Sequence, residues 1–516
     1  MKKITGTGGF VFRSKARFLR GLCAFILAFG SAFSAIAETP TEHALTQAAQ
    51  LEVAGKFNDA SNLLTHALAS RPPGGLNAKI GFELDRLQRI RLDFPLTQEA
   101  LFASLQKSVR GLTTNEFNQW LGEGRFDSRT IDGQVWFESS SVANLFFRHP
   151  ELEARRLEGE KIDIAGEKGV LAMCRAIKHA AQRDGQPYVL PKRFDVTMTV
   201  TAGTDAVPAG QIIRAWLPIP RAYPYQTDFE IVTSSPPVKA VAPADSPIRS
   251  AYFEQPANGS TPTEFKLHYR FTRDAVWFDI DPARVMRFDG HDPAIAAFTR
   301  ESPHVVFTPE MRALSKRIAG NTKNPALVAK NFYDWIGENI QYSYTPEYST
   351  IRNISDYIRA RGYGDCGQEA LLFITLCRLN GIPARWQSGW RIFPGSEGIH
   401  DWAEIYLAPY GWVPVDLTMS IWAMHSATTL TLRERLEIRD FFFGGMDPWR
   451  MAANGDHSQT LSPPKNSFRS DDVDFQRGEL ESGGRNIYFN HFSYHLKAVE
   501  LPSAKKTKTK DSSNIR

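Results

Sequence analysis

Cysteine, metal-binding motifs and phosphate-binding loops are scarce or absent in this sequence. Only four of its 516 residues are cysteine, which excludes a disulfide-rich scaffold. Neither HExxH nor CxxC occurs, and no loop has the residue spacing of a phosphate site or of a calcium site. We therefore expect the protein to bind no metal and no nucleotide cofactor.

Long apolar runs are confined to the first 37 residues. Basic residues up to Arg20 precede an apolar stretch that starts at Leu22, and Ala35-Ile36-Ala37 has the small-x-small form of a cleavage site. This pattern predicts a signal peptide over residues 1–37, with cleavage after Ala37; a retained N-terminal anchor is the alternative. Since no later run reaches 18 apolar residues, we expect a periplasmic or secreted protein whose mature chain has no transmembrane segment.

The net charge of +5 comes from the two ends of the chain. Residues 1–37 hold six basic residues and no acidic one, and residues 503–516 hold five basic residues and one acidic. Residues 38–502 carry a net charge of −5, which removes the main support for a nucleic-acid partner. The polar segment 501–516 lacks apolar periodicity and is predicted to be a disordered basic tail.

The spacing of apolar residues changes along the chain and divides it into regions. With 42% hydrophobic and 23% charged residues, the composition is that of a globular protein of about three domains. Helical spacing predicts an N-terminal helical region over 38–185, and alternation at period two predicts an antiparallel β-sandwich over 186–300. Mixed signals over 301–460 predict an α+β core, and residues 461–500 are interpreted as a linker and one strand. The expected fold class is therefore multidomain α+β.

Three cysteines remain after the predicted signal cleavage, so at least one thiol is free or pairs between chains in an oxidising compartment. Cys366 is predicted to open a helix that runs to Asn380, where unpaired helical N–H groups stabilise a thiolate. Cys366 is therefore the candidate nucleophile, with an expected reactivity midpoint below pH 8, whereas Cys377 is interpreted as a core residue. A disulfide from Cys174 to one of these two cysteines is the alternative.

A base for this thiol is expected on a predicted β-hairpin. His400 begins one strand and Asp416 lies on the next. A three-residue loop at 408–410 makes them diagonal neighbours on one face, whereas a four-residue loop turns Asp416 away. Asp401, on the opposite face, and Glu404, about 13 Å along the strand, are rival acceptors. We predict that Asp416 orients His400.

Several motifs over about residues 305–420 occur in a characteristic order. Gly364-Asp365-Cys366-Gly367-Gln368 opens the predicted helix, and Gly381-Ile382-Pro383-Ala384-Arg385 leads into a strand. His400-Asp401-Trp402-Ala403-Glu404 and Gly411-Trp412-Val413-Pro414-Val415-Asp416 follow. This segment resembles the transglutaminase-like superfamily, and a preceding β domain is similar to the arrangement in its bacterial members.

The resemblance implies a papain-like core in which Cys366, His400 and Asp416 act as a catalytic triad on a peptide or protein amide. Attack by Cys366 gives a thioester acyl-enzyme, and we favour its hydrolysis by water, as in an amide hydrolase or peptidase. The alternatives are a protein-glutamine acyltransferase that forms crosslinks and a non-catalytic peptide-binding protein on the same scaffold. Besides the Cys366 N–H, the candidate oxyanion donors are Gln341, Tyr342 and Gln368; the cleft candidates are Trp390 and Trp402.

Overall fold

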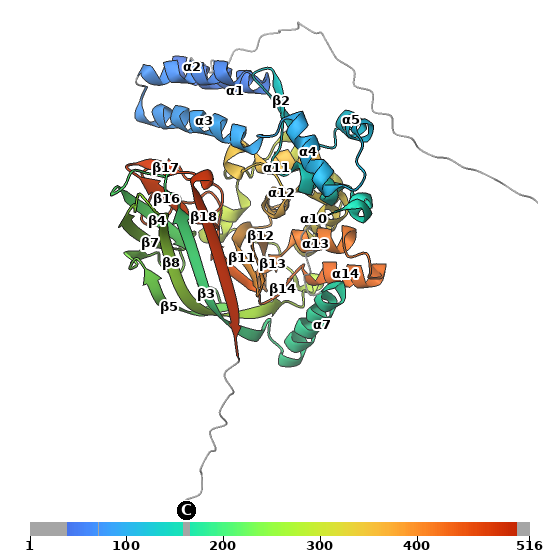
Figure 1. The fold of residues 1–516 in the computed structure, drawn as a ribbon. Coiled ribbons are helices and arrows are strands. Elements are labelled where there is room, and N and C mark those ends of the chain that lie inside the picture. Colours follow the sequence, from blue (N-terminus) through green and yellow to red (C-terminus); the bar gives the residue numbers. More distant parts are fainter. Residues whose placement is uncertain (1–38, 71, 158–165, 503–516) are drawn as a thin grey trace, which may run out of the picture.

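The structure of the protein is a computed structural model that describes residues 39–70, 72–157 and 166–502. The predicted signal peptide and residues 503–516 of the predicted tail lie outside these ranges. Figure 1 shows a layer of N-terminal helices above a mixed core, with a β-sandwich at one side. No helix of the described ranges is long and apolar enough to cross a membrane.

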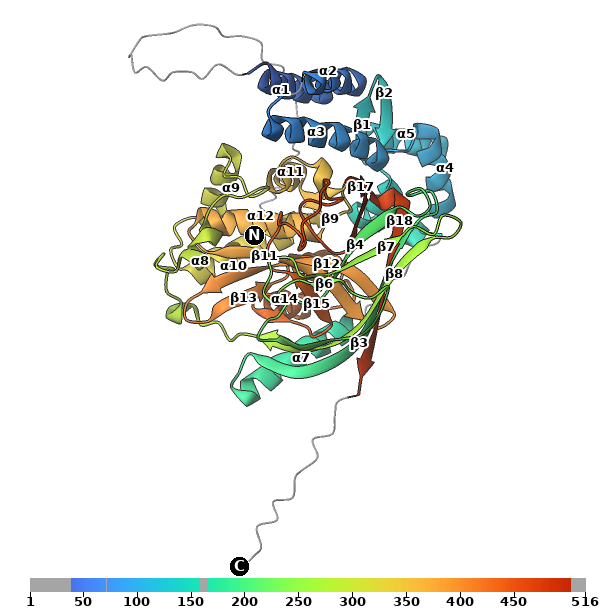
Figure 2. The ribbon, with the colours of Figure 1, turned by 90° about the vertical axis from the view of Figure 1, so that its left-hand side faces the viewer.

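Helices α1–α6 form the N-terminal layer, whereas α7 packs elsewhere. Figures 1 and 2 both place α1–α3 above the rest of the molecule and α7 at the opposite end. There α7 shares a hydrophobic cluster with Trp277 and Phe441, so it belongs to the packing of the core. A short hairpin, β1–β2, interrupts the region predicted to be helical. The elements are α1 (Pro40–Val53), α2 (Phe57–Ala69), α3 (Gly74–Asp93), α4 (Gln98–Ser108), α5 (Thr114–Gly122), β1 (Ser128–Ile131), β2 (Gln134–Phe137), α6 (Ser141–Arg148), the 3-10 helix η1 (Pro150–Arg155) and α7 (Gly166–Asp184).

Two five-stranded sheets form the β-sandwich. One has the order β14-β8-β3-β18 with β5 also paired to β8, and the other has the order β17-β16-β4-β7-β6. Alternate residues of β3 and β8, such as Phe194 and Phe265, are fully buried in the cluster between the sheets. The strands that follow α7 are β3 (Tyr188–Ala202), β4 (Ile212–Pro218), β5 (Gln226–Ser235), β6 (Ala240–Val241), β7 (Ser250–Pro256) and β8 (Thr263–Trp277).

Residues 461–500 are more than the linker and single strand expected from the sequence. They contain β16 (Glu479–Ser482), β17 (Arg485–Ile487), the 3-10 helix η5 (Phe489–His491) and most of β18 (Phe492–Leu501), so this segment completes both sheets of the sandwich. The preceding residues 455–478 form no helix or strand, yet Val473 and Phe475 are buried. Proline and serine near residue 463 are typical of a linker, which is why one was predicted. The packing contacts of this segment are made with residues far away in the sequence, and a local pattern cannot show them.

The core contains a four-stranded antiparallel sheet of order β13-β12-β11-β15, against which α12 packs. Helix α12 is buried on every side from Gly367 to Arg378. Together with the sandwich, these helices and antiparallel sheets confirm the α+β class. The elements are the 3-10 helices η2 (Pro282–Arg284), η3 (Ala297–Thr299) and η4 (Tyr348–Thr350), the helices α8 (Pro293–Ala296), α9 (Pro309–Ala319), α10 (Pro325–Asn339), α11 (Ile354–Arg361), α12 (Cys366–Leu379), α13 (Leu417–His425) and α14 (Leu432–Phe441), and the strands β9 (Gln341–Tyr342), β10 (Tyr363–Gly364), β11 (Ala384–Phe393), β12 (Ser396–Leu407), β13 (Gly411–Val415), β14 (Gly445–Met446) and β15 (Arg450–Asn454).

The hairpin β12–β13 has the register on which the proposed pairing of His400 with Asp416 depends. Leu407 pairs with Gly411 and Ala403 with Val415, which leaves a three-residue loop at 408–410. Continuing this register places Trp402 opposite Asp416, the residue that follows β13. The three-residue alternative is therefore the correct one.

Gly389 on β11 lies where the chain approaches β15 too closely for a side chain. A Cβ atom at this position overlaps the carbonyl oxygen of Met451 and lies 3.0 Å from the backbone nitrogen of Ala453. Since a backbone neighbour cannot rotate away, we expect Gly389→Ala to lower the free energy of unfolding by about 3 kcal/mol, as other forced overlaps in packed cores do. Urea-induced unfolding measures the loss. Gly398→Ala on β12 is the matched control, because a Cβ there meets nothing within 4 Å; equal stability of the two variants would contradict the assignment.

Candidate active site

Cys366 is the first residue of α12, and a capped helix N-terminus fixes its position. Asp365 caps the helix by accepting a hydrogen bond of 3.2 Å from the backbone N–H of Gln368. The hydroxyl of Tyr348 donates to the same carboxylate at 2.6 Å and that of Thr345 at 3.0 Å. Cys366 is partly exposed. Because the cap fixes the start of α12, the thiol has a fixed position beside the first N–H groups of the helix.

His400, on β12, contacts the carboxylate that follows β13. His400 Nε2 lies 2.9 Å from Asp416 Oδ2, and the His400 side chain keeps 12% of its surface exposed. The other oxygen of Asp416 accepts a hydrogen bond of 3.1 Å from the N–H of Met419 and so caps α13. The predicted pairing of these two side chains is thus present, and the carboxylate that holds the imidazole is itself held by a helix.

Arg450, on β15, contacts the same carboxylate of Asp416 as His400 does. Its Nη1 lies 2.7 Å from Asp416 Oδ2, and its other nitrogens contact Asp447 at 2.8 Å. Burial raises the pKa of Asp416, but the neighbouring His400 and Arg450 outweigh it and hold that pKa well below its usual range. Burial lowers the pKa of His400, against the opposing effect of Asp416, so the imidazole is neutral near pH 7 and can accept a proton.

The thiol of Cys366 donates its hydrogen bond to Asp401. The distance from Sγ to Asp401 Oδ2 is 3.2 Å. Burial raises the pKa of the Cys366 thiol well above its usual value, and the carboxyls of Asp401, Asp365 and Glu369 raise it further. This direction is opposite to the expected lowering of the thiol pKa, because burial above all, and then the three carboxyls, outweigh the helix N-terminus.

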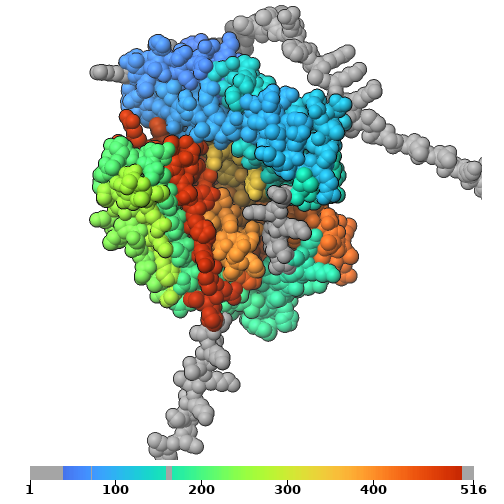
Figure 3. All heavy atoms as spheres, in the orientation of Figure 1, coloured from blue at the N-terminus to red at the C-terminus, as the bar shows by residue number. Residues whose placement is uncertain are grey.

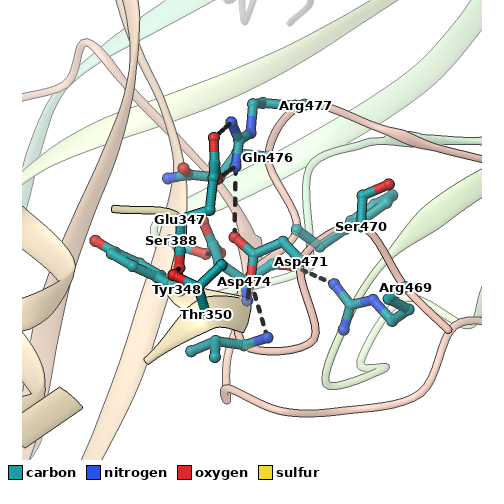
Figure 4. A network of polar contacts seen from close by, with 12 residues as sticks. Glu347, Tyr348, Thr350, Ser388, Arg469, Ser470, Asp471, Asp474, Gln476 and Arg477 are labelled. Atoms are coloured by element: carbon teal, nitrogen blue, oxygen red, sulfur yellow. Dashed lines mark hydrogen bonds and ion pairs between the residues drawn. The ribbon is translucent and has the colours of Figure 1, made fainter. Parts of the chain in front are cut away.

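Segment 455–478 reaches the strand that carries His400. The side-chain amide of Gln476 donates to Asp401 Oδ1 at 2.8 Å, to the carbonyl of His400 at 2.9 Å and to the carbonyl of Gly389 at 3.1 Å. Figure 4 shows the neighbouring anchors of this segment, where Arg477 contacts Glu347 and Asp474 lies beside Ser388. A segment that the sequence suggested was a linker thus forms part of the site.

Several carboxyls behind the site are buried and have raised pKa values. Burial is the main cause in each case, and neighbouring carboxyls add to it. The pKa is raised to about 6 for Asp365, to about 7 for Asp93, and to about 8 for Glu138 and Asp471. These groups therefore hold protons in the folded protein at pH values where an unfolded chain has lost them.

We expect the free energy of unfolding to fall as the pH rises from about 4 to above 8. The raised pKa values stabilise the folded state fully below the unfolded values near 4, and this stability is lost as the pH passes through 6 to 8. Each proton difference gives a slope of up to about 1.4 kcal/mol per pH unit. Urea unfolding at pH 5, 7 and 9 measures it. Asp471→Asn should flatten the slope, and a wild-type stability that rises over this window would contradict the prediction.

The three candidate oxyanion donors lie in different surroundings. Gln341 is exposed on β9, and Tyr342 next to it is half-buried. Burial raises the pKa of the Tyr342 hydroxyl, and Cys366 contributes to the rise. Gln368 is fully buried against Gly364, where a Cβ would lie 2.6 Å from its Oε1. The role of each of the three side chains as an oxyanion donor stays a prediction.

The two tryptophans expected in the cleft are core residues. Trp402 is fully buried and donates its indole N–H to Gln387, and Trp390 is 4% exposed and donates to the carbonyl of Gln476 at 2.8 Å. Both therefore belong to the packing of the sheet. The aromatic ring that packs on Tyr342 comes instead from Phe147 of α6, with ring centroids 5.0 Å apart.

Figure 3 shows a hollow on one face of the molecule, bounded by the blue N-terminal helices and the red strand β18. Its floor has the yellow and orange colours of the core. Phe147 and Tyr342 link the N-terminal layer to the core in this part of the chain, and Tyr344 extends the aromatic group with its centroid 5.3 Å from that of Phe147. The N-terminal layer thus packs against β9 of the core through these aromatic rings.

The other two described cysteines play no part in the site. Cys174 on α7 and Cys377 on α12 are buried, and both are free, as is Cys366. Burial raises their pKa values well above the usual thiol value. The interpretation of Cys377 as a core residue is confirmed, and the alternative of a disulfide to Cys174 is wrong.

Comparison with known proteins supports the motif-based resemblance. Residues 312–417 match the family model of the transglutaminase-like superfamily, and this segment contains Cys366, His400 and Asp416. No curated protein matches the chain. Among solved structures, the chain is similar to a proposed cysteine protease from Cytophaga hutchinsonii, with 17% identity, a TM-score of 0.40, and coverage of 61% of this chain and 93% of that chain.

Two further structures are similar to smaller parts of the chain. The periplasmic domain of TgpA from Pseudomonas aeruginosa shows 16% identity and a TM-score of 0.26, covering 45% of this chain and 98% of that chain. A proposed protease from Parabacteroides distasonis shows 14% identity and a TM-score of 0.18, covering 43% of this chain and 46% of that chain. The resemblance to the transglutaminase-like superfamily therefore depends on the match of residues 312–417, and these structures add no argument to it.

Proposed function

We propose that this chain, whose residues 312–417 form a transglutaminase-like core, is a secreted cysteine-dependent hydrolase of peptide or protein amides. The observation that carries the proposal is the pairing of His400 with Asp416 at 2.9 Å, in one segment with a cysteine that opens a helix. A neutral imidazole held by a buried carboxylate is the usual base for a cysteine or serine nucleophile.

The reaction divides into two halves. In the first, His400 takes the proton of Cys366, and the thiolate attacks the carbonyl carbon of the amide. The tetrahedral intermediate collapses as the C–N bond breaks, the imidazolium returns the proton to the leaving amine, and a thioester remains on Cys366. The oxyanion forms beside the N-terminus of α12, where helical N–H groups favour negative charge.

In the second half, His400 takes a proton from water, and the hydroxide attacks the thioester. The C–S bond breaks, a carboxylic acid leaves and Cys366 regains its proton. Asp416 keeps the imidazole in one orientation and stabilises its charged form throughout, while Arg450 keeps Asp416 ionised. Water reaches any open thioester, whereas transfer to an amine requires a second site that binds the amine and excludes water.

Mass spectrometry of the protein incubated with amide substrates, such as cell-wall peptides, proteins and isopeptides, tests this proposal. We expect an acyl adduct on Cys366 and the release of free carboxylate. Cys366→Ala should form no adduct, whereas Cys377→Ala, a change on the same helix, should retain it.

A labelled primary amine, added to the same reactions, separates the two chemistries. Carboxylate release that exceeds amine incorporation supports a hydrolase, and the reverse supports an acyltransferase. The absence of an adduct across all substrate classes would favour the peptide-binding alternative.

A further inference from the structure

Asp401 holds the thiol of Cys366, although His400 is the base that the proposed reaction requires. His400 and Asp401 are neighbours on β12 and have different hydrogen-bond partners. His400 contacts Asp416 at 2.9 Å, and Asp401 Oδ2 accepts from Cys366 at 3.2 Å. The resting thiol is therefore bound to a group outside the triad.

Contacts on both sides fix the carboxylate of Asp401. Its Oδ1 accepts a hydrogen bond of 2.8 Å from Gln476, and its Oδ2 lies 3.4 Å from the hydroxyl of Tyr348. Asp401 itself is 3% exposed, so water does not replace these partners. A side chain with this many contacts has one orientation, and that orientation presents Oδ2 to the sulfur.

Gln476 couples this carboxylate to the strand of the base. The same amide that contacts Asp401 also donates to the carbonyls of His400 and Gly389, which are register partners on β12 and β11. The next residue, Arg477, pairs with Glu347 at 2.8 Å and so holds the chain in place beside Gln476. One residue of segment 455–478 thus sets the positions of both the thiol partner and the base.

We propose that Asp401, oriented by Gln476, is a positioning residue that keeps Cys366 protonated and in place until His400 takes the proton. The proposal rests on the proposed function only in taking Cys366 as the nucleophile. Its physical basis is that the acceptor oxygen of Asp401 holds the S–H in one direction. Burial raises the pKa of Asp401 itself, and once this carboxyl is ionised it disfavours a second negative charge on the sulfur.

Other charged groups also face these two side chains and must be separated from Asp401. Asp365, Glu369, Tyr342 and Tyr348 influence or adjoin Cys366 from η4, β9 and α12 with its cap. Asp471 and Asp474 of segment 455–478 face Asp401 from the other side. A test therefore needs a variant at Asp401 and a second variant that removes a neighbouring carboxyl without touching the sulfur.

The rate at which iodoacetamide alkylates Cys366, followed from pH 5 to pH 10, tests the proposal. The thiolate displaces iodide and forms an S–C bond, so the rate reports the thiolate fraction and needs no amide substrate. In Asp401→Asn, the Oδ1 atom can still accept the hydrogen bond from Gln476, and the side-chain N–H groups, which are donors, then face the sulfur. We expect the midpoint to move down by at least about one pH unit, which is a tenfold gain in rate at pH values below the midpoint.

Asp474→Asn is the matched control. It is equally buried, and it contacts Ser388 and Asn454 instead of Cys366. Asp401→Ala, which removes the charge without adding a donor, should shift the midpoint in the same direction as Asp401→Asn, and circular dichroism shows whether each variant is folded. An unchanged or raised midpoint in Asp401→Asn, or an equal shift in Asp474→Asn, overturns the proposal. Because alkylation is independent of turnover, these outcomes are distinct from a failure to hydrolyse amides.

Discussion

His400→Ala is expected to lower the rate of acylation of Cys366 by about 10²- to 10⁴-fold, the contribution typical of a positioned general base. His400 is the only imidazole that contacts Asp416 among the described residues, and its pKa is lowered by burial, which keeps it available as a proton acceptor. Single-turnover formation of the thioester measures the effect directly, without interference from the second half-reaction.

His268→Ala provides a matched control for this loss. His268 also contacts an aspartate, with Nε2 2.5 Å from Asp195 Oδ1, but it lies on β8 in the sandwich. This variant should acylate at the wild-type rate. If His400→Ala loses less than about tenfold while His268→Ala behaves as expected, the carboxylate of Asp401, which already contacts the thiol, is the better candidate for the base.

Arg450→Met is expected to lower the free energy of unfolding by about 3–5 kcal/mol, the cost of leaving buried charges without their partner. Arg450 is 1% exposed and contacts both Asp416 and Asp447, so its removal leaves two carboxylates in the interior. Methionine has a similar length and fills much of the same space, so the loss reports the charge. Urea-induced unfolding at pH 7, followed by tryptophan fluorescence, measures it.

Lys330→Met is the control for removing a charge from the surface. Lys330 contacts Asp334 and Asp440 but is partly exposed, and such pairs contribute about 1 kcal/mol or less. Equal losses of unfolding free energy in Arg450→Met and Lys330→Met would contradict the interpretation that Arg450 belongs to a buried network of charges. A second consequence follows for His400: Arg450 lowers its pKa, so Arg450→Met should move the acid limb of the pH–rate profile to higher pH.

The local pattern of the sequence predicted the parts of the site that lie close together in the chain. The loop at 408–410 and the alternation of β12 were sufficient to place His400 beside Asp416, because hairpin register follows from loop length. The helix predicted from Cys366 to Asn380 is likewise present as α12, which begins at Cys366. These features depend on neighbours within about 20 residues.

The residues that control the site from farther away could not be found in this way. Arg450 contacts Asp416 across 34 positions, and Gln476 contacts Asp401 across 75. Strand β15 is five residues long and buried throughout, so it shows no alternation that would indicate a strand. The direction of the Cys366 pKa shift differs from the prediction for the same reason. The prediction included the helix N-terminus but omitted the burial of the thiol, which is the largest cause, and the contact with Asp401.

The order of the site residues along the chain has a consequence for biosynthesis. Cys366, His400 and Asp416 leave the ribosome before Arg450, and Gln476 emerges last. A nascent or truncated chain that ends before residue 476 therefore contains the nucleophile and its base, but lacks the amide that holds Asp401 and the strands that close both sheets of the sandwich. The last segment of the chain is thus needed to complete both the contacts of Asp401 and the two sheets of the sandwich.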